Sequence, residues 1–282
     1  MNPFLVHSAF PPEFPPAWAS AWGEDEFGIY AEFVVADVVQ RCRWMPPGRF
    51  LMGAPESEEG RDGKEGPQHE VMLSGFWLAD TACTQALWLA VIGENQSYFK
   101  DAPMQAVMRK RPGNFENALV NPVEMVSWHQ CRVFFGRLNA LVPGLFAWFP
   151  SEAQWEYACR AGTTSSYSFG VTITHEQVHF GPGRRGNTVP VSYLPANPWG
   201  LYEMHGNVWE WCSDWFGAYA AEPQVDPEGP DNGWSRVLRG GSWFDDAHAV
   251  RSVSRSGGDS DHRSRYIGLR VAPGRAGPVE PA

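Results

Sequence analysis

Residues 197–211 read NPWGLYEMHGNVWEW, and this stretch concentrates the residue types that characterise the whole chain. The full sequence of 282 residues contains 14 Trp, 29 Gly and 24 Pro. Large aromatic rings bury much surface, whereas Gly and Pro interrupt helices and strands. The sequence therefore predicts a compact fold with little regular secondary structure.

Three helices are predicted from residues that typically cap helix ends. Thr84 is a suitable N-cap for a helix that ends at Gly93, a residue that readily takes the left-handed conformation. Residues 127–130 (SWHQ) and 151–154 (SEAQ) are capping boxes, in which the Ser and Gln side chains each accept a backbone N–H of the other residue. Gly162 is expected to end the third helix.

Outside these helices, the sequence predicts short strands and turns. The chain is also expected to divide into three regions. Residues 44–54 have a strand, turn and strand pattern, and residues 71–78 form another apolar strand. Residues 1–42 are rich in aromatic residues and proline and are expected to pack on the domain as an N-terminal segment. Residues 43–272 form the domain, and residues 273–282 are expected to be a disordered tail.

Composition argues against several functions. The net charge is −10 and no long basic run is present, so nucleic-acid binding is not expected. No apolar stretch is long enough to cross a bilayer, and no signal peptide is recognisable at the start. Five scattered cysteines without a CxxC pair favour a reducing, cytoplasmic location without a disulfide framework.

Several long motifs together resemble one known family. They are 47–53 (PGRFLMG), 121–128 (NPVEMVSW), 150–162 (PSEAQWEYACRAG), 197–211, 237–243 (VLRGGSW) and 267–272 (IGLRVA). Across roughly residues 43–272, they are similar to the formylglycine-generating enzyme (sulfatase-modifying factor) family. The resemblance implies an α+β, C-type-lectin-like fold of the formylglycine-generating-enzyme type, with low regular secondary structure.

The resemblance does not extend to the catalytic centre. Enzymes of this family hold copper with two cysteine thiolates just after the Gly-Gly-Ser-aromatic motif, and soft thiolates suit Cu(I). In this chain residues 240–255 contain no cysteine, and the last cysteine is Cys212. Copper and formylglycine synthesis are therefore not expected.

A calcium site is implied by the same resemblance. The matching positions supply two side chains, Glu203 and Glu210, and two backbone carbonyls, those of Gly206 and Val208. Oxygen ligands of this kind suit Ca²⁺. The alternative is a loop held by ion pairs alone.

Residues 244–266 read FDDAHAVRSVSRSGGDSDHRSRY and contain no Lys, Glu, Gln, Met or Trp. These five residue types are the ones that cannot arise when the adenines of AAC or AAT codons are replaced at random. The pattern resembles variable proteins of diversity-generating retroelements, in which mutagenesis rewrites a surface patch on a fixed fold. The segment predicts a hypervariable surface for an unknown protein or other macromolecular ligand, made from adaptable residue types. The alternative is a degraded family member whose loop drifted to polar residues.

The predicted contact residues are the members of this segment that are expected to be exposed: Phe244, Asp245, Asp246, His248, Ala249, Ser252, Ser254, Ser256, Gly257, Gly258, Asp259, Ser260, His262, Ser264, Arg265 and Tyr266. Three arginines of the segment, Arg251, Arg255 and Arg263, are expected to be partly buried and paired with carboxylates beneath the surface.

Two other functions remain as alternatives. A metal-dependent oxidoreductase of the formylglycine-generating or sulfoxide-synthase type would gather His205, His248 and His262. A regulatory or structural subunit would use the N-terminal segment as a docking arm. Residues 175–179 also match the HExxH zinc pattern, but the surrounding Gly and β-branched residues predict a loop or short strand instead of the helix that zinc binding needs.

Overall fold

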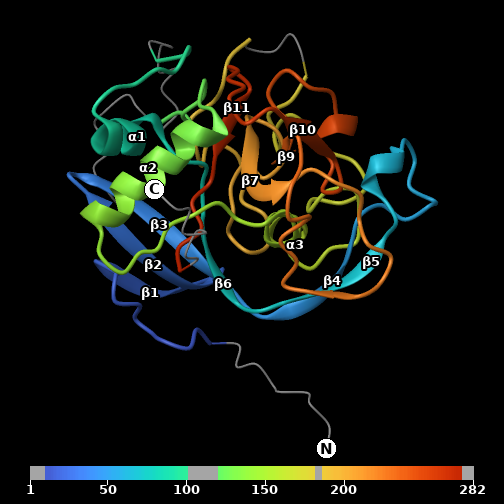
Figure 1. The fold of residues 1–282 in the computed structure, drawn as a ribbon, viewed down its shortest axis with the longest axis horizontal. Coiled ribbons are helices and arrows are strands. Elements are labelled where there is room, and N and C mark those ends of the chain that lie inside the picture. The colour runs from blue at the N-terminus through green and yellow to red at the C-terminus, as the bar shows by residue number, and fades with distance from the viewer. Residues whose placement is uncertain (1–9, 101–119, 182–185, 275–282) are drawn as a thin grey trace, which may run out of the picture.

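The computed structural model describes residues 10–100, 120–181 and 186–274, which form three small β-sheets and three α-helices (Figure 1). The first sheet has the order β1-β2-β3-β6, with strands Ala21–Asp25, Gly28–Val35, Val38–Met45 and Phe76–Ala79. The second has the order β10-β9-β7-β11, with strands Arg255–Gly258, Arg236–Arg239, Trp209–Trp215 and Ile267–Leu269. The third has the order β4-β5-β8, with strands Gly48–Met52, His69–Leu73 and Gln224–Val225. The predicted α+β class with little regular structure is confirmed.

The three helices begin at the predicted caps and the first ends before Gly93 as predicted, whereas the third ends with Ala161 as its C-cap, one residue before Gly162. They are α1 (Gln85–Ile92), α2 (Trp128–Leu141) and α3 (Glu152–Arg160). The Thr84 side chain accepts the N–H of Leu87, and Gly93 takes a left-handed φ of 92°. Both capping boxes are formed in full, at Ser127 and at Ser151. Two short 3-10 turns, η1 (Gly63–Glu65) and η2 (His248–Val250), complete the elements.

The N-terminal region is more regular than the sequence suggests. Its described part contains β1, β2 and half of β3, which form an antiparallel meander joined to β6. Trp18 packs edge-on against Phe33 and Trp77, with ring centroids 6.3 and 5.6 Å apart. Only residues 273 and 274 of the predicted tail lie within the described part of the chain.

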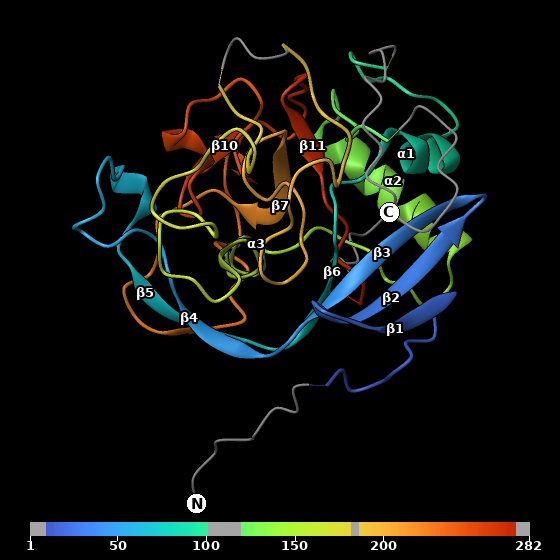
Figure 2. The ribbon, with the colours of Figure 1, turned by 180° about the vertical axis from the view of Figure 1, so that it is seen from behind.

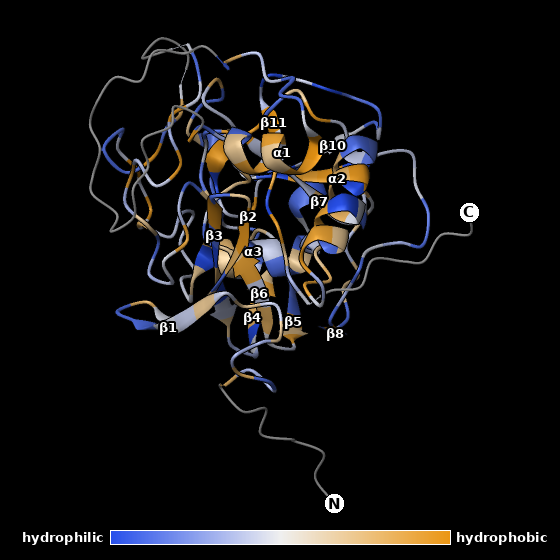
Figure 3. Cartoon of the chain, turned by 90° about the vertical axis from the view of Figure 1, so that its left-hand side faces the viewer, coloured by the Kyte–Doolittle hydropathy of each residue, from blue (hydrophilic) through white to orange (hydrophobic). Residues whose placement is uncertain are grey.

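Two clusters of buried side chains hold the sheets together. One lies between the first sheet and helices α1 and α2, where Trp88 and Phe134 stack with centroids 5.0 Å apart. The other lies around α3 and includes Trp155, packed with residues of β4, β5, β7 and β9. Figure 3 shows hydrophobic residues concentrated on the helices and inner strands. Burying each large side chain contributes roughly 1.5–3 kcal/mol to folding.

The first and second sheets lie beside each other, as Figure 2 shows from behind. Strand β6 connects them, because the N–H of Ala79 donates to the carbonyl of Val271, just after β11. This arrangement places the chain between β9 and β11, which contains residues 244–266, at one end of a rigid framework (Figure 1). None of the helices in the described ranges is long and apolar enough to pass through a membrane.

Candidate ligand-binding surface

Residues 244–266 leave β9 through a tight turn at Gly240 and Gly241, whose φ angles are 98° and 70°. A side chain at Gly241 would meet Val250, because a Cβ there would lie 2.5 Å from its Cγ1. The returning segment therefore packs closely on the turn. Eight residues of the segment are exposed: Phe244, Asp246, His248, Gly257, Asp259, Asp261, His262 and Arg263. Of the predicted contact residues, Asp245, Ala249, Ser256, Ser260, Ser264, Arg265 and Tyr266 are half-buried.

Three predicted contact residues are buried, so the prediction that Ser252, Ser254 and Gly258 face a ligand is wrong. Gly258 lies against the indole of Trp211, where a Cβ would come within 2.6 Å of the ring. The two serines are drawn inward by their own backbone carbonyls, which are hydrogen-bonded to a buried arginine.

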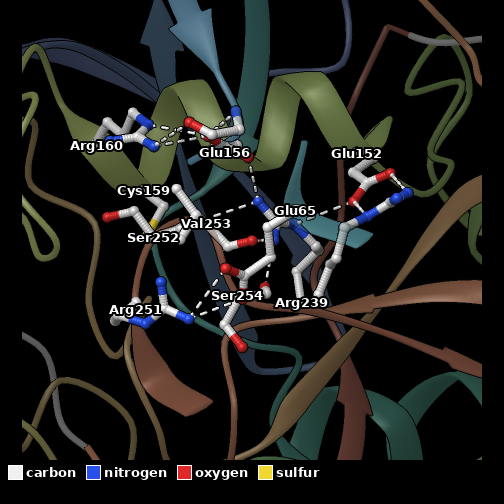
Figure 4. Close-up of polar contacts among 12 residues, drawn as sticks. Glu65, Glu152, Glu156, Cys159, Arg160, Arg239, Arg251, Ser252, Val253 and Ser254 are labelled. Carbon is white, nitrogen blue, oxygen red and sulfur yellow. Dashed lines mark hydrogen bonds and ion pairs between the residues drawn. The ribbon is translucent and has the colours of Figure 1, made fainter. Parts of the chain in front are cut away.

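Arg239 on β9 is that arginine, and it is fully buried. Its Nη1 donates to the carbonyl of Val253 at 3.0 Å and also to that of Ser254. Its Nη2 donates to the carbonyl of Ser252 at 2.8 Å and to Glu156 Oε2 at 2.5 Å. Figure 4 shows these groups gathered beside helix α3. Burial alone would lower the pKa of Arg239, but the Glu156 carboxylate holds it above its usual value.

A second buried arginine, which belongs to the segment itself, is paired in the same region. Arg255 forms a two-pronged contact with Glu152, at 2.7 Å (Nε to Oε1) and 2.5 Å (Nη2 to Oε2). Tyr219 donates its hydroxyl to the same carboxylate at 3.0 Å. Burial raises the pKa of Glu152, but the charges of Arg255 and Arg239 outweigh it and the net pKa is lowered. The ionised pair therefore fixes the inner face of β10.

The predicted burial and carboxylate pairing are confirmed for Arg255 and Arg251, whereas the predicted burial is wrong for Arg263. Arg251 is buried and reaches into the acidic loop of residues 56–65, where its Nη1 and Nη2 lie 2.8 Å from Glu58 and 2.8 Å from Glu65. Arg263 is exposed, because the chain at residues 259–263 turns outward beyond the end of β10. Buried arginines thus hold the middle of the segment, and its two flanks face outward.

Beside the exposed flanks lies a group of side chains that we call the aromatic patch. It consists of five aromatic residues and one arginine: Tyr98, Phe99, Trp243, Phe244, Tyr266 and Arg265. The centroid of the Trp243 ring lies 5.6 Å from that of Phe99 and 5.3 Å from that of Tyr266. Phe244 and Tyr266 are also 5.3 Å apart. Tyr98 is 64% exposed and Phe244 is 47% exposed. The patch thus offers two open aromatic rings on a packed base.

Tyr98 and Phe99 come from a distant part of the chain, and the sequence gives no local signal that they join this surface. Buried Glu124 holds them, because its two carboxylate oxygens accept the N–H of Tyr98 at 3.0 Å and that of Phe99 at 2.8 Å. Burial raises the pKa of Glu124, although these two N–H donors act in the opposite direction. Glu124 therefore positions one wall of the patch.

Replacing Glu124 with glutamine should lower the free energy of unfolding by about 1–3 kcal/mol, because the amide leaves one buried N–H without an acceptor. Urea denaturation followed by tryptophan fluorescence measures this change. Exposed Glu222→Gln is the matched control and should stay within about 0.5 kcal/mol of the original protein. Equal stability of the two variants would contradict the positioning role.

Asp245 supports the turn that precedes the segment. Its Oδ2 accepts three hydrogen bonds. Two come from Ser242, from the backbone N–H (2.9 Å) and the side-chain hydroxyl (2.5 Å), and the third comes from the indole N–H of Trp209 (2.9 Å). That oxygen is therefore committed within the protein. Asp245 acts mainly by fixing the path of the Gly-Gly-Ser-Trp turn.

The two carboxylates predicted to hold calcium have partners within the protein. Glu210 is buried, and its carboxylate contacts the Arg270 guanidinium at 2.8 Å and the indole N–H of Trp155 at 2.7 Å. Glu203 accepts the backbone N–H groups of Ser192 and Leu194 instead. The Arg270 guanidinium neutralises Glu210, and calcium at Glu203, Glu210 and the carbonyls of Gly206 and Val208 stays a prediction.

The three histidines of the oxidoreductase alternative have separate partners. Both ring nitrogens of buried His205 are engaged: Nδ1 with the carbonyl of Val250 at 2.8 Å and Nε2 with the N–H of Ser168 at 3.1 Å. His248 contacts Gly60, and His262 is exposed. Within the described ranges no group of three or more His, Cys, Asp and Glu side chains could hold a metal ion.

The HExxH match at residues 175–179 forms turns and not a helix, as the sequence predicts. His175 stacks on Phe180 with centroids 4.4 Å apart, whereas His179 Nε2 contacts the carbonyl of Asn187 at 2.8 Å. The two imidazoles thus have different protein partners.

All five cysteines are free thiols and buried. The Sγ of Cys159 lies 3.6 Å from His205 Nε2, and burial raises the pKa of this thiol to about 12. A thiol held in its neutral form is a poor nucleophile and a poor ligand for copper.

Comparison with known proteins places this surface in context. The family "Sulfatase-modifying factor enzyme 1-like domain" matches residues 35–274. The formylglycine-generating enzyme of Streptomyces coelicolor is 29% identical over 281 residues, which cover 81% of this chain and 87% of that enzyme. The serine/threonine-protein kinase pkn1 of Chlamydia caviae is 32% identical over 245 residues, which cover 80% of this chain but only 37% of that protein.

Among solved structures, Treponema denticola variable protein 1 superposes with a TM-score of 0.74 at 25% identity. The match covers 86% of this chain and 98% of the variable protein. The fold is thus of the formylglycine-generating-enzyme type, as the motifs indicate.

Proposed function

This chain belongs to the sulfatase-modifying factor enzyme 1-like domain family, and we propose that it is a non-catalytic member that binds a macromolecular ligand through a hypervariable surface. The observation that carries the proposal is the division of residues 244–266 into a buried middle and exposed flanks. The buried middle is held by Arg239, Arg251 and Arg255, all paired with carboxylates. A buried middle of this kind would keep the fold unchanged while the residues on the exposed flanks are substituted.

Two further observations support this function. The positions where the family's enzymes carry copper-binding cysteines hold no cysteine in this chain. The chain is also similar in structure to Treponema denticola variable protein 1 over 86% of its length. We propose a cytoplasmic location as well, because five free thiols suit a reducing compartment.

The gene offers the most direct test of hypervariability. Near the codons for Phe244 to Tyr266, we expect a near-copy of that stretch which differs only where the copy has adenine. A reverse transcriptase gene should lie beside it. If the surrounding DNA holds neither, the surface is a fixed binding surface and hypervariability is refuted.

Randomising Phe244, Asp246 and His262 together should leave most variants folded, with free energies of unfolding within about 1 kcal/mol of the original, because these side chains are exposed. The matched library at Ser252, Ser254 and Gly258 should yield mostly unfolded variants. Overpacking a filled core costs about 1–3 kcal/mol per site, and three sites act together. A protease-resistance screen of both libraries measures the folded fraction. Equal folded fractions would refute the proposed division.

A further inference from the structure

The aromatic patch contains the positive charge of Arg265, which has no carboxylate partner in the part of the chain that the structure describes. The Arg265 guanidinium lies 5.7 Å from the centroid of Tyr98, 5.6 Å from that of Trp243 and 5.2 Å from that of Tyr266. Its Nε and Nη2 donate to the Tyr266 hydroxyl at 3.2 and 3.0 Å. Among the described residues no carboxylate lies within ion-pair distance of it, in contrast to Arg239, Arg251 and Arg255.

The surroundings of Arg265 fix its guanidinium in place before any ligand arrives. Aromatic faces hold a guanidinium through cation–π attraction while leaving its charge unneutralised. The two hydrogen bonds to the Tyr266 hydroxyl restrict the rotation of the side chain. A preorganised guanidinium of this kind binds a carboxylate through strong, charge-assisted hydrogen bonds.

Open aromatic rings flank this charge. Tyr98 and Phe244 are the most exposed rings of the patch, and each offers a rigid apolar face at low entropic cost. Rings this exposed form a surface and not an enclosed pocket, and a surface of this shape suits a segment of another protein.

The charge around the patch selects among anionic ligands. Asp246, Asp259 and Asp261 are exposed in the same segment, and the whole chain carries a net charge of −10. These carboxylates repel a continuous phosphate backbone but tolerate a single carboxylate placed over Arg265.

We propose that the aromatic patch of this sequence binds a peptide segment of a partner protein that places one Asp or Glu carboxylate on Arg265 and neighbouring apolar or aromatic side chains on Tyr98 and Phe244. This inference rests on the proposed binding function and names its ligand class. It also makes Tyr98, which lies outside residues 244–266, a contact residue of the constant framework.

Panning a displayed library of random 12-residue peptides on the intact protein tests the proposal. Enriched peptides should carry Asp or Glu beside an aromatic residue. For a synthetic peptide of the enriched sequence, changing that acid to its amide should weaken binding about tenfold or more, measured by calorimetry. Arg265→Gln and Tyr98→Ala should weaken it similarly, and Arg265→Lys should weaken it less because the charge is kept.

Arg263→Gln is the matched control, since Arg263 is exposed in the same segment, whereas Arg265 is the arginine over the rings of the patch. It should change the dissociation constant less than about twofold, because exposed charges contribute little. The proposal is overturned if enriched peptides lack an acid, if Arg265→Gln behaves like Arg263→Gln, or if no peptide is enriched. The proposed function survives those outcomes, because the near-copy in the gene and the two libraries judge it separately.

Discussion

Replacing Arg239 with methionine should lower the free energy of unfolding by about 3–5 kcal/mol, the cost of breaking a buried ion pair by removing one partner. The change removes the donors for the carbonyls of Ser252, Val253 and Ser254 at once. It also leaves the buried Glu156 with Arg160 as its remaining ion-pair partner. Guanidinium chloride denaturation measures the loss.

The same variant should show where the loss occurs. Hydrogen exchange followed by mass spectrometry should report lost protection in residues 251–258 before helix α1 is affected. Arg239→Lys should recover only part of the stability, because an ammonium cannot reproduce the planar fork that serves three carbonyls and a carboxylate. Exposed Arg263→Met is the control and should change stability by less than about 0.5 kcal/mol. Equal stabilities of the two methionine variants would refute the anchoring role.

Acidification should lower the free energy of unfolding through the protonation of His205. Burial lowers the pKa of this histidine from 6.5 to about 4, so the folded protein binds fewer protons than the unfolded chain between these values. The contribution of His205 is therefore fully present above about pH 6.5 and is lost as the pH falls to about 4. The difference amounts to about 3 kcal/mol, at 1.36 kcal/mol for each pH unit.

Free energies of unfolding measured from pH 7 to pH 4 isolate this effect when the protein is compared with His205→Gln, which does not titrate in this range. The variant should lose about 3 kcal/mol less than the original over that interval. His262→Gln, at an exposed histidine of the same surface, should keep the original pH dependence. Identical pH profiles of the protein and His205→Gln would show that His205 is not buried in its neutral form. Since His205 Nδ1 contacts the Val250 carbonyl, acid should loosen η2 first.

The division of the surface segment has a consequence for evolution as well as for stability. Arg251 and Arg255 pair with carboxylates that lie on η1, on the acidic loop and on α3. A substitution at either arginine would leave a buried carboxylate unpaired, which is costly. Changes that are tolerated should therefore gather on the two flanks, at residues such as Phe244 and His262.

Local signals in the sequence were sufficient for the helices and for the family. The capping boxes at Ser127 and Ser151 act over three residues, so their geometry follows from the sequence without knowledge of the rest of the fold. The absence of cysteine after Cys212 and the long ordered motifs are likewise properties of the sequence alone. They determine the fold type and remove the copper-binding pair of the family's enzymes.

Only the tertiary structure decided which residues of the segment face outward. Ser252 and Ser254 have the polar character of surface residues, yet they are buried because Arg239 hydrogen-bonds to their carbonyls. Arg255 and Arg263 are equivalent in sequence terms, but only Arg255 meets a carboxylate, that of Glu152, 103 residues away. Burial and pairing of this kind depend on contacts between distant parts of the chain, which a local pattern of residues does not encode.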